Sequence, residues 1–429
     1  MRNKMILVLL AITVLCAQVF AAGNSQSGAA SASGSGPVTL KWSVWDYSTT
    51  AYYDDFANAY KAKNPGVQFE FIDLGSADYN TVLLTQLAGG ADLDLLTVKD
   101  IAGYSNMLRQ NRLEPLNSYI RSANIDTRQY GGIIEQLTFN GEAYALPFRS
   151  DFYIIYYNKD LFDRAGVPYP TNDMTLDQYD ALARRVTQGS GASKVYGTHY
   201  HTWPFMVWHF GLMDGRTITD GTYDFLAPHY ERVVKQQDDG IVMGYSTIRT
   251  SGTHYSGVFF NSQIAMMHMG SWFIATQIAT VARGEASSTN WGIVKYPHPA
   301  GVQAGTTLGS VTGIGVNRNS RNKDAALDFM KFISGPEGAA IIAKTGNFPA
   351  IMSPEVINTI ASTPGFPSDA NSREALNVYQ NYFERPVNER MADIEDILGE
   401  IHGDIMTKNI SVNDGIRLMN DRVGRLLGR

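Results

Sequence analysis

The sequence predicts an α/β protein built on a mostly parallel sheet. Short segments with apolar side chains at every second position alternate with helical segments through the first hundred residues, and the same order returns in the middle of the chain. Strands that are separated by helices tend to pair in parallel, because the helix carries the chain back along the sheet. With 44% hydrophobic and 18% charged residues among its 429, the chain has enough apolar material for packed cores.

The first third of the chain carries the clearest pattern. Apolar and polar residues alternate over 38–44, as in a strand with one buried face. A helix should then run to about Lys63, where Asn64-Pro65-Gly66 stops it. The following segments, in the order strand, helix, strand, are residues 67–71, 79–87 and 93–98.

The middle and the end of the chain repeat these signals. Thr175 and Gln178 form a capping box that should open a helix. Residues 323–333 predict another helix, and Pro336 is placed to start the next one. Further strands are expected at 153–157, 264–269, 291–294 and 313–316, and two amphipathic helices near the end have their apolar positions within 394–405 and 412–423.

The first 36 residues are expected to precede the folded part. Two basic residues stand before an apolar run of 11, and cleavage after Ala21 would remove residues 1–21 as a signal peptide. Residues 22–36 are almost entirely Ala, Gly and Ser and predict a flexible leader. We therefore expect a periplasmic protein. A lipid anchor at Cys16 stays open as an alternative, although the leucine in front of it fits such a signal poorly.

Charge, cysteine content and motifs exclude several classes of function. The net charge of −6 argues against nucleic acid as the main partner, and the single cysteine excludes an intramolecular disulfide. The sequence contains no GxSxG, HExxH, Walker A or dinucleotide signature, so we expect no enzyme, no catalytic residue and no cofactor. His199 and His201, with His209 nearby, could belong to a metal site, but we favour a polar loop rich in aromatic residues and expect no metal.

Several segments together resemble family 1 of the extracellular solute-binding proteins, the sugar binders of ABC importers that include maltose-binding protein. The run Tyr-Tyr-Asn-Lys-Asp-Leu-Phe-Asp-Arg-Ala-Gly-Val at 156–167 looks like the family's most distinctive motif, and Gly-Glu-Ala-Tyr-Ala-Leu-Pro precedes it at 141–147. Weaker similarities follow the family's order at 93–96, 260–272 and 322–338.

The resemblance implies a periplasmic-binding-protein fold with two α/β lobes, mostly parallel sheets, a cleft between the lobes and three crossovers. Gly and Pro residues, which interrupt regular secondary structure, suggest crossovers near Pro147, near Tyr296-Pro297 and near Gly346-Asn347. One lobe would comprise residues 37–147 and 297–346, and the other 148–296 and 347–429. The implied partners are a small solute in the cleft and the membrane subunits of an ABC permease, for a chain that acts as a monomer.

The candidate site residues match the family's contact loops. Trp272 follows a strand and would stack on a sugar ring, unless it is a core residue under a loop. Asp46 and Asp100 end strands and would accept hydrogen bonds from hydroxyls, unless Asp46 caps a helix and Asp100 lies in a solvated turn. Arg149 and Asp151 would contact the solute or pair with each other.

The remaining candidates have equally plain alternatives. Trp203 could simply pack, and Asn347 could cap a helix. Gly309 and Ser310 would offer backbone N–H groups to the ligand. The full set of expected ligand-binding residues is Trp45, Asp46, Tyr47, Lys99, Asp100, Arg149, Asp151, Trp203, Trp272, Gly309, Ser310 and Asn347.

We expect the chain to capture a mono- or oligosaccharide and to deliver it to the permease without covalent chemistry. Aromatic and acidic residues would also suit a polyamine through cation–π contacts, whereas Lys99 and Arg149 would favour an organic anion. A secreted carbohydrate-active enzyme would need two carboxylates roughly 5–10 Å apart across the cleft. A sensory role would use the same residues as uptake, and the sequence does not distinguish the two roles.

Overall fold

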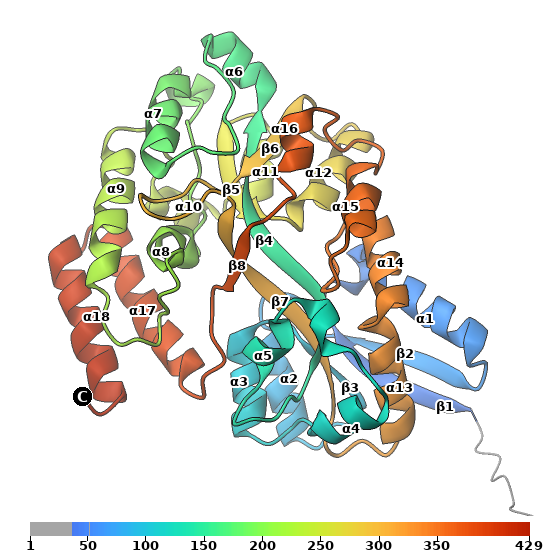
Figure 1. Ribbon diagram of the computed structural model, residues 1–429. Helices are drawn as coiled ribbons and strands as arrows, with labels where there is room; N and C mark the ends of the chain where they lie inside the picture. The colour runs from blue at the N-terminus through green and yellow to red at the C-terminus, as the bar shows by residue number, and fades with distance from the viewer. Residues whose placement is uncertain (1–36, 51) are drawn as a thin grey trace, which may run out of the picture. The chain divides into compact units, whose positions relative to one another are not determined.

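A mixed sheet of eight strands carries the fold (Figure 1). The computed structural model describes residues 37–50 and 52–429, so the predicted signal peptide, Cys16 and the predicted leader lie outside the described residues. The strands are β1 (Val38–Val44), β2 (Val67–Asp73), β3 (Leu95–Val98), β4 (Leu146–Asn158), β5 (Met266–Gly270), β6 (Trp291–Lys295), β7 (Thr306–Val316) and β8 (Gln380–Phe383).

The direction of the strands corrects the expectation of a mostly parallel sheet. The order is β2-β1-β3-β7-β4-β5, with β6 also paired to β4 and β8 to β7. The pairs β1–β2, β1–β3 and β7–β8 are parallel, whereas β3–β7, β4–β7, β4–β5 and β4–β6 are antiparallel. A strand–helix–strand pattern predicts direction only for strands that follow one another. Because β7 reaches β3 from far along the chain, no local pattern fixes its direction.

Helices cover the sheet and form the C-terminal part of the chain (Figure 1). The α-helices are α1 (Tyr52–Lys63), α2 (Tyr79–Ala88), α3 (Ile101–Arg109), α4 (Asn117–Ser122), α5 (Ile133–Leu137), α6 (Lys159–Ala165), α7 (Leu176–Val186), α8 (Phe205–Leu212), α9 (Ala227–Asp238), α10 (Tyr245–Ser251), α11 (Tyr255–Phe260), α12 (Phe273–Ala282), α13 (Lys323–Ile333), α14 (Pro336–Lys344), α15 (Pro354–Ala361), α16 (Ala370–Glu374), α17 (Met391–Met406) and α18 (Val412–Leu426). The 3₁₀ helices are η1 (Tyr47–Thr49), η2 (Thr127–Tyr130), η3 (Gly191–Ser193) and η4 (Asp224–Leu226).

Most elements expected from the sequence are present. The elements β1, α1, β2, α2 and β3 follow in the predicted order, and α13 has the predicted bounds. The capping box of α7 is confirmed, because Thr175 Oγ1 accepts from the Gln178 N–H at 3.2 Å and Gln178 Oε1 accepts from the Thr175 N–H at 2.8 Å. The strands expected at 153–157 and 313–316 are only the last parts of β4 and β7.

The long strands β4 and β7 join two groups of elements. The first half of β4 pairs with β7, and its second half pairs with β5 and β6. The register of the β4–β7 pair shifts between Pro147 and Arg149. Residues 348–350 run beside β4, where the Ser150 N–H donates to the Phe348 oxygen at 3.1 Å and the Ala350 N–H to the Phe148 oxygen at 3.0 Å. Three chain segments are therefore hydrogen-bonded side by side at residues 147–152 of β4.

Two clusters of buried apolar side chains form the core. The smaller one is centred on Trp42, whose Nε1 donates to Thr97 Oγ1 at 2.7 Å and whose ring meets Tyr53 and Phe329 edge-on. The larger one surrounds the second half of β4 and extends to α17 and α18. Over the described residues, the helices are too short or too polar to span a lipid bilayer.

Candidate functional site

Trp272 lies between β5 and α12, and its ring rests on the backbone of Gly270. A Cβ atom on Gly270 would lie 2.0 Å from Cζ3 and 2.2 Å from Cη2 of Trp272, so only glycine allows this contact. Tyr153 meets the indole edge-on at a centroid distance of 5.5 Å, and Nε1 donates to the Tyr255 hydroxyl at 3.2 Å. The side chain is half-buried. It is therefore held in one orientation while the residue stays partly exposed, unlike a core tryptophan.

Arg149 and Asp151 form an ion pair next to this indole. Arg149 Nε donates to Asp151 Oδ2 at 2.7 Å and Nη1 donates to the Tyr52 hydroxyl at 3.1 Å. Asp151 Oδ1 accepts from Ser271 Oγ at 2.8 Å, and the two ion-paired side chains are 15% and 2% exposed. Burial opposes the charged form of Arg149, but Asp151 and Tyr52 raise its pKa. The pairing of Arg149 with Asp151 is thus observed, and a contact of either residue with the solute stays a prediction.

Trp203 belongs to the same aromatic group as Trp272. It lies in the loop before α8 and is 36% exposed. Its ring centroid is 6.3 Å from that of Trp272 and 5.6 Å from that of Tyr255, and the His201 ring meets it edge-on at 4.8 Å. We call Tyr153, His201, Trp203, Tyr255 and Trp272 the tryptophan cluster.

Trp45, Asp46 and Lys99 lie where β1 and β3 end. Lys99 Nζ is 5.7 Å from the centroid of the Trp45 ring and donates to the backbone oxygen of Ser76. Burial lowers the pKa of Lys99, whereas Asp100 and Asp46 raise it. Asp46 is exposed with a φ of 49°, and its side chain makes no capping hydrogen bond to η1.

Asp100 and Tyr47 have partners within the protein. Asp100 Oδ1 accepts from the Gly103 N–H at 2.7 Å, and Asn80 Nδ2 donates to both carboxylate oxygens at 3.0 and 2.8 Å. Asp100 therefore caps α3 and does not lie in a solvated turn. The Tyr47 hydroxyl donates to Asp54 Oδ1 at 2.6 Å. Contacts of either residue with solute stay predictions.

Gly309 and Ser310 lie within β7, and Asn347 follows α14. A Cβ on Gly309 would lie 2.1 Å from the Asp151 oxygen and 2.6 Å from the Asn381 side chain, so glycine lets β4, β7 and β8 approach. Ser310 is paired with Asp151 across β4 and β7. Asn347 Nδ2 donates to Thr345 Oγ1 at 2.9 Å. Contacts of these three residues with a ligand stay predictions.

Electrostatic interactions connect the tryptophan cluster with the end of β1. Burial raises the pKa of Tyr255, the hydrogen bond from Trp272 and the charge of Arg149 lower it, and Asp151 and Asp46 raise it. Asp46 and Arg149 therefore act on the same hydroxyl, the one that accepts from the Trp272 indole. Asp46 after β1, Arg149 and Asp151 of β4, and Trp272 after β5 thus all influence the pKa of Tyr255.

Sequence reasoning missed Tyr255, Ser271 and Tyr52. Ser271 stands beside Trp272 in the Gly-Ser-Trp segment, which could have marked it as a partner of the site. Tyr255 begins the short helix α11 and Tyr52 begins α1, and neither position carries a local signal. Their roles arise only from contacts between distant segments.

A buried charge network near Asp100 was also missed. Arg385 donates to Glu384 and, at 2.8 and 2.6 Å, to Glu395, and its guanidinium lies 4.1 Å from the centroid of Phe205. Burial disfavours the charged Arg385, but Glu395, Glu384 and Asp100 raise its pKa. Glu384 also accepts from His209 Nε2 at 3.1 Å. The guanidinium thus bonds one carboxylate at the end of β8 and one in α17, so the network ties these two elements together.

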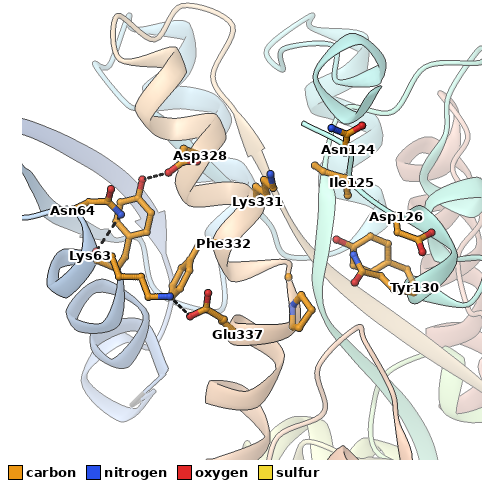
Figure 2. A pocket seen from close by; sticks show the side chains of 14 residues that line it. Lys63, Asn64, Asn124, Ile125, Asp126, Tyr130, Asp328, Lys331, Phe332 and Glu337 are labelled. Atoms are coloured by element: carbon orange, nitrogen blue, oxygen red, sulfur yellow. Dashed lines mark hydrogen bonds and ion pairs between the residues drawn. The ribbon is translucent and has the colours of Figure 1, made fainter. Parts of the chain in front are cut away.

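A separate cavity lies away from the tryptophan cluster. It has about 440 Å³ and is lined by residues of α1, η2, α13 and α14 (Figure 2). Its charged side chains are already engaged: Lys63 with Glu337, Asp328 with the Tyr60 hydroxyl, and Lys331 with a backbone oxygen. The predicted site residues are not part of its lining.

The histidines at 199 and 201 have ring centroids 6.0 Å apart. Over residues 37–50 and 52–429, no three His, Cys, Asp or Glu side chains are arranged to hold a metal ion. His209 contacts Glu384 in the network described above.

Known proteins are similar to this chain over most of its length. The sequence profile of the bacterial extracellular solute-binding proteins matches residues 46–340. The crystal structure of a sugar transporter from Rhizobium etli, in an open conformation, has a TM-score of 0.81 and 52% identity, and covers 90% of this chain and 99% of that chain. An ABC substrate-binding protein from Listeria monocytogenes in complex with cycloalternan has a TM-score of 0.77 and 21% identity over 91% of this chain and 99% of that one.

A sequence relative extends the comparison to a different solute. The sn-glycerol-3-phosphate-binding periplasmic protein of Escherichia coli (strain K12) is 21% identical over 318 residues, which are 69% of this chain and 70% of that protein. Because the profile matches well over half of the residues, this chain belongs to the bacterial extracellular solute-binding protein family.

Proposed function

We propose that the chain is the solute-binding component of an ABC importer and that it captures a carbohydrate at the tryptophan cluster. The observation that carries this proposal is the Trp272 indole, held by Gly270 and Tyr255 in a residue that stays partly exposed. A fixed indole suits the apolar face of a sugar ring. The family consists of solute-binding proteins, so the chain acts in transport and not as an enzyme.

Polar groups around the indole suit the hydroxyls of a sugar. Arg149 is fixed by Asp151 and Tyr52, and one of its terminal nitrogens, Nη2, has no hydrogen-bond partner among residues 37–50 and 52–429. Hydrogen bonds to charged groups are worth about 1.5–3 kcal/mol each. The Rhizobium etli protein, at 52% identity, is described as a sugar transporter, which supports a carbohydrate for this chain as well.

We further propose that the solute lies between two lobes, 37–147 with 297–346 and 148–296 with 347–429. Three side-by-side segments support this division: β4 near Pro147, β7 near Gly309, and residues 348–350. They would be the three crossovers. The middle one would then lie near Gly309, later in the chain than Tyr296-Pro297, so that residues 297–308 would belong to the second lobe. The arrangement would let the lobes close around a solute.

The finer localisation is likewise a proposal. The family is extracellular, and residues 1–21 have the features of a signal peptide, so we propose export to the periplasm. In the periplasm, the chain would reach the permease that receives the solute. Attachment through Cys16 is the alternative, and mass spectrometry of the exported protein distinguishes a lipidated Cys16 from a chain that begins near Ala22.

An organic anion is the second candidate solute. Lys99 and Arg149 are two cations among the candidate site residues, and the Escherichia coli relative is named for binding sn-glycerol-3-phosphate. A phosphate ester would pair with both cations. The carbohydrate remains favoured because Arg149 already has a carboxylate partner and the polar nitrogen of the Trp272 indole is already bonded to Tyr255.

Thermal unfolding with a panel of solutes tests the proposal. The panel contains neutral mono- and oligosaccharides, glycerol 3-phosphate, polyamines and amino acids. A solute at 100 times its Kd adds about 2.7 kcal/mol to the free energy of unfolding, which raises Tm by several degrees. We expect a shift with one class of saccharide and its loss in Trp272→Ala. A shift with glycerol 3-phosphate alone would overturn the carbohydrate, and a shift that survives in Trp272→Ala would overturn the role of the indole.

A further inference from the structure

Glu384 and Arg385 directly follow β8 and carry opposite charges inside the core. Their side chains are 7% and 19% exposed, and Arg385 donates to the Glu384 carboxylate. Burial disfavours the ionised Glu384, but the charge of Arg385 and two hydrogen bonds keep its pKa below the usual range. Replacing a buried ion pair by apolar residues of similar size is often neutral or stabilising, so stability alone does not explain such a pair.

Glu384 is bonded to the aromatic residues that support the Trp272 indole. Its Oε2 accepts from His209 Nε2 at 3.1 Å, and the carboxylate also accepts a hydrogen bond from the Tyr153 hydroxyl. The His209 and Tyr153 rings are in contact, with centroids 4.2 Å apart. Tyr153 in turn meets the Trp272 indole edge-on at 5.5 Å. A single side chain thus separates the buried carboxylate from the indole.

Arg385 holds Glu384 between two helices. Its guanidinium donates to Glu395 of α17 at 2.8 and 2.6 Å and lies 4.1 Å from the centroid of Phe205 in α8. His209, which is bonded to Glu384, belongs to the same helix α8. Because the planar guanidinium is anchored on two sides, the carboxylate that it pairs with has little freedom to move.

The cavity that Glu384 and Arg385 line is too small for a solute. It has about 10 Å³, which is room for one water molecule at most. Asp100, Gly309 and Ser310 line it as well, so the pair lies next to three candidate site residues without facing open space. An effect of the pair on the solute must therefore pass through other side chains.

We propose that Glu384 is a positioning residue that fixes the Trp272 indole, through Tyr153, in the orientation that the solute requires. Arg385 keeps the carboxylate in place, and neither charged residue touches the solute. This inference rests on the proposed function. The affinity depends on the pair because a stacking surface that is fixed in advance loses less conformational freedom when the solute binds.

A double-mutant cycle on solute affinity tests the inference. The probes are glucose, galactose, maltose and mannobiose, and calorimetry on every variant uses the one that binds most tightly. Glu384→Gln keeps the shape of the side chain and removes its charge, and we expect it to weaken binding about fivefold. In the Trp272→Phe background the same change should weaken binding by less than about twofold, because the indole that Glu384 positions is absent. A merely structural role predicts the same loss in both backgrounds.

Two further variants separate positioning from general destabilisation. Tyr153→Phe removes only the hydroxyl that bonds Glu384 and keeps the ring against Trp272, so it should also weaken binding about fivefold. Lys159→Gln is the matched control. It breaks an ion pair of the same chain, in which Lys159 Nζ donates to Asp369 at 2.7 Å and the side chains are 16% and 32% exposed. It should lower Tm and leave the affinity unchanged.

Circular dichroism and Tm are checked for each variant, and Tyr153→Phe takes the place of Glu384→Gln in the cycle if the latter is unfolded. Unchanged affinity in Tyr153→Phe or in a folded Glu384→Gln overturns the inference and leaves the proposed function in place. An equal loss in both Trp272 backgrounds, or in Lys159→Gln, does the same. Absence of binding by every saccharide of the panel overturns the proposed function and the inference with it.

Discussion

At the scale of single residues, the absence of a side chain at Gly270 is as important as the presence of one at Trp272. The indole occupies the space that a Cβ would need, so its position depends on the glycine. Sequence reasoning could select Trp272 because it follows a strand and matches a family position. It could not find Tyr255, which is 17 residues away and meets Trp272 only because α11 packs against α12.

The dependence of Trp272 on Gly270 yields a prediction. In Gly270→Ala, the new methyl group would overlap the six-membered ring and displace the indole from its position. We expect a loss of about 1 kcal/mol of binding free energy, roughly a fivefold loss of affinity, measured by calorimetry with the saccharide that gives the largest thermal shift.

A matched variant provides the control. In Gly424→Ala, in α18, the new methyl group would have a single neighbour within 4 Å, at 3.9 Å, so this variant adds a methyl group without overlap. Its affinity should equal that of the unchanged protein. Unaltered binding in Gly270→Ala would mean that the position of the indole does not matter for the solute.

At the scale of elements, the sequence predicts the helices and strands that show a local hydrophobic period. It misses the strands that form only because they pair with strands distant in the chain. The first strand and helices have a clear period and are found where expected. The first half of β7 contains Gly309 and two threonines without alternation, and β8 is polar, so neither has a local strand signal. They are strands because β7 pairs with β4 and with β8.

Gly309 tests the importance of this pairing. In Gly309→Ala the methyl group would lie 2.1 Å from the backbone oxygen of Asp151, and a backbone atom cannot move aside as a side-chain end can. We expect a decrease of about 1–3 kcal/mol in the free energy of unfolding, measured by urea denaturation. Ser310→Ala removes one hydroxyl from the next residue and should leave the midpoint almost unchanged. Equal midpoints for both variants would show that β4 and β7 can separate at no cost.

At the scale of the whole molecule, buried histidines link stability to pH. Burial lowers the pKa of His199 and His402 to about 3, and that of His201 and His229 to about 4. The unfolded chain, with an ordinary histidine pKa near 6.5, takes up protons that the folded chain does not. The stabilisation is therefore complete above about pH 6.5 and decreases as the pH falls from there toward 3.

Unfolding by urea at pH 7.5, 6.5, 5.8 and 5.0 measures this dependence. Above pH 5 the carboxylates stay mostly ionised in both states, so the histidines dominate the change. We expect the free energy of unfolding to fall continuously below pH 6.5. In His402→Gln the fall should be smaller, by up to about 2 kcal/mol at pH 5, because one buried imidazole is gone. A constant free energy over this range would contradict the neutral, buried state of these rings.

The position of β7 in the sheet has a consequence for the timing of folding. Its residues pair with those of β3 that lie more than 200 positions earlier in the chain. The sheet cannot close until most of the polypeptide has been synthesised, and such distant pairings form slowly. A nascent chain that remains open for this long can be threaded through a membrane channel before it folds. In a member of an extracellular family, late closure of the sheet thus favours secretion.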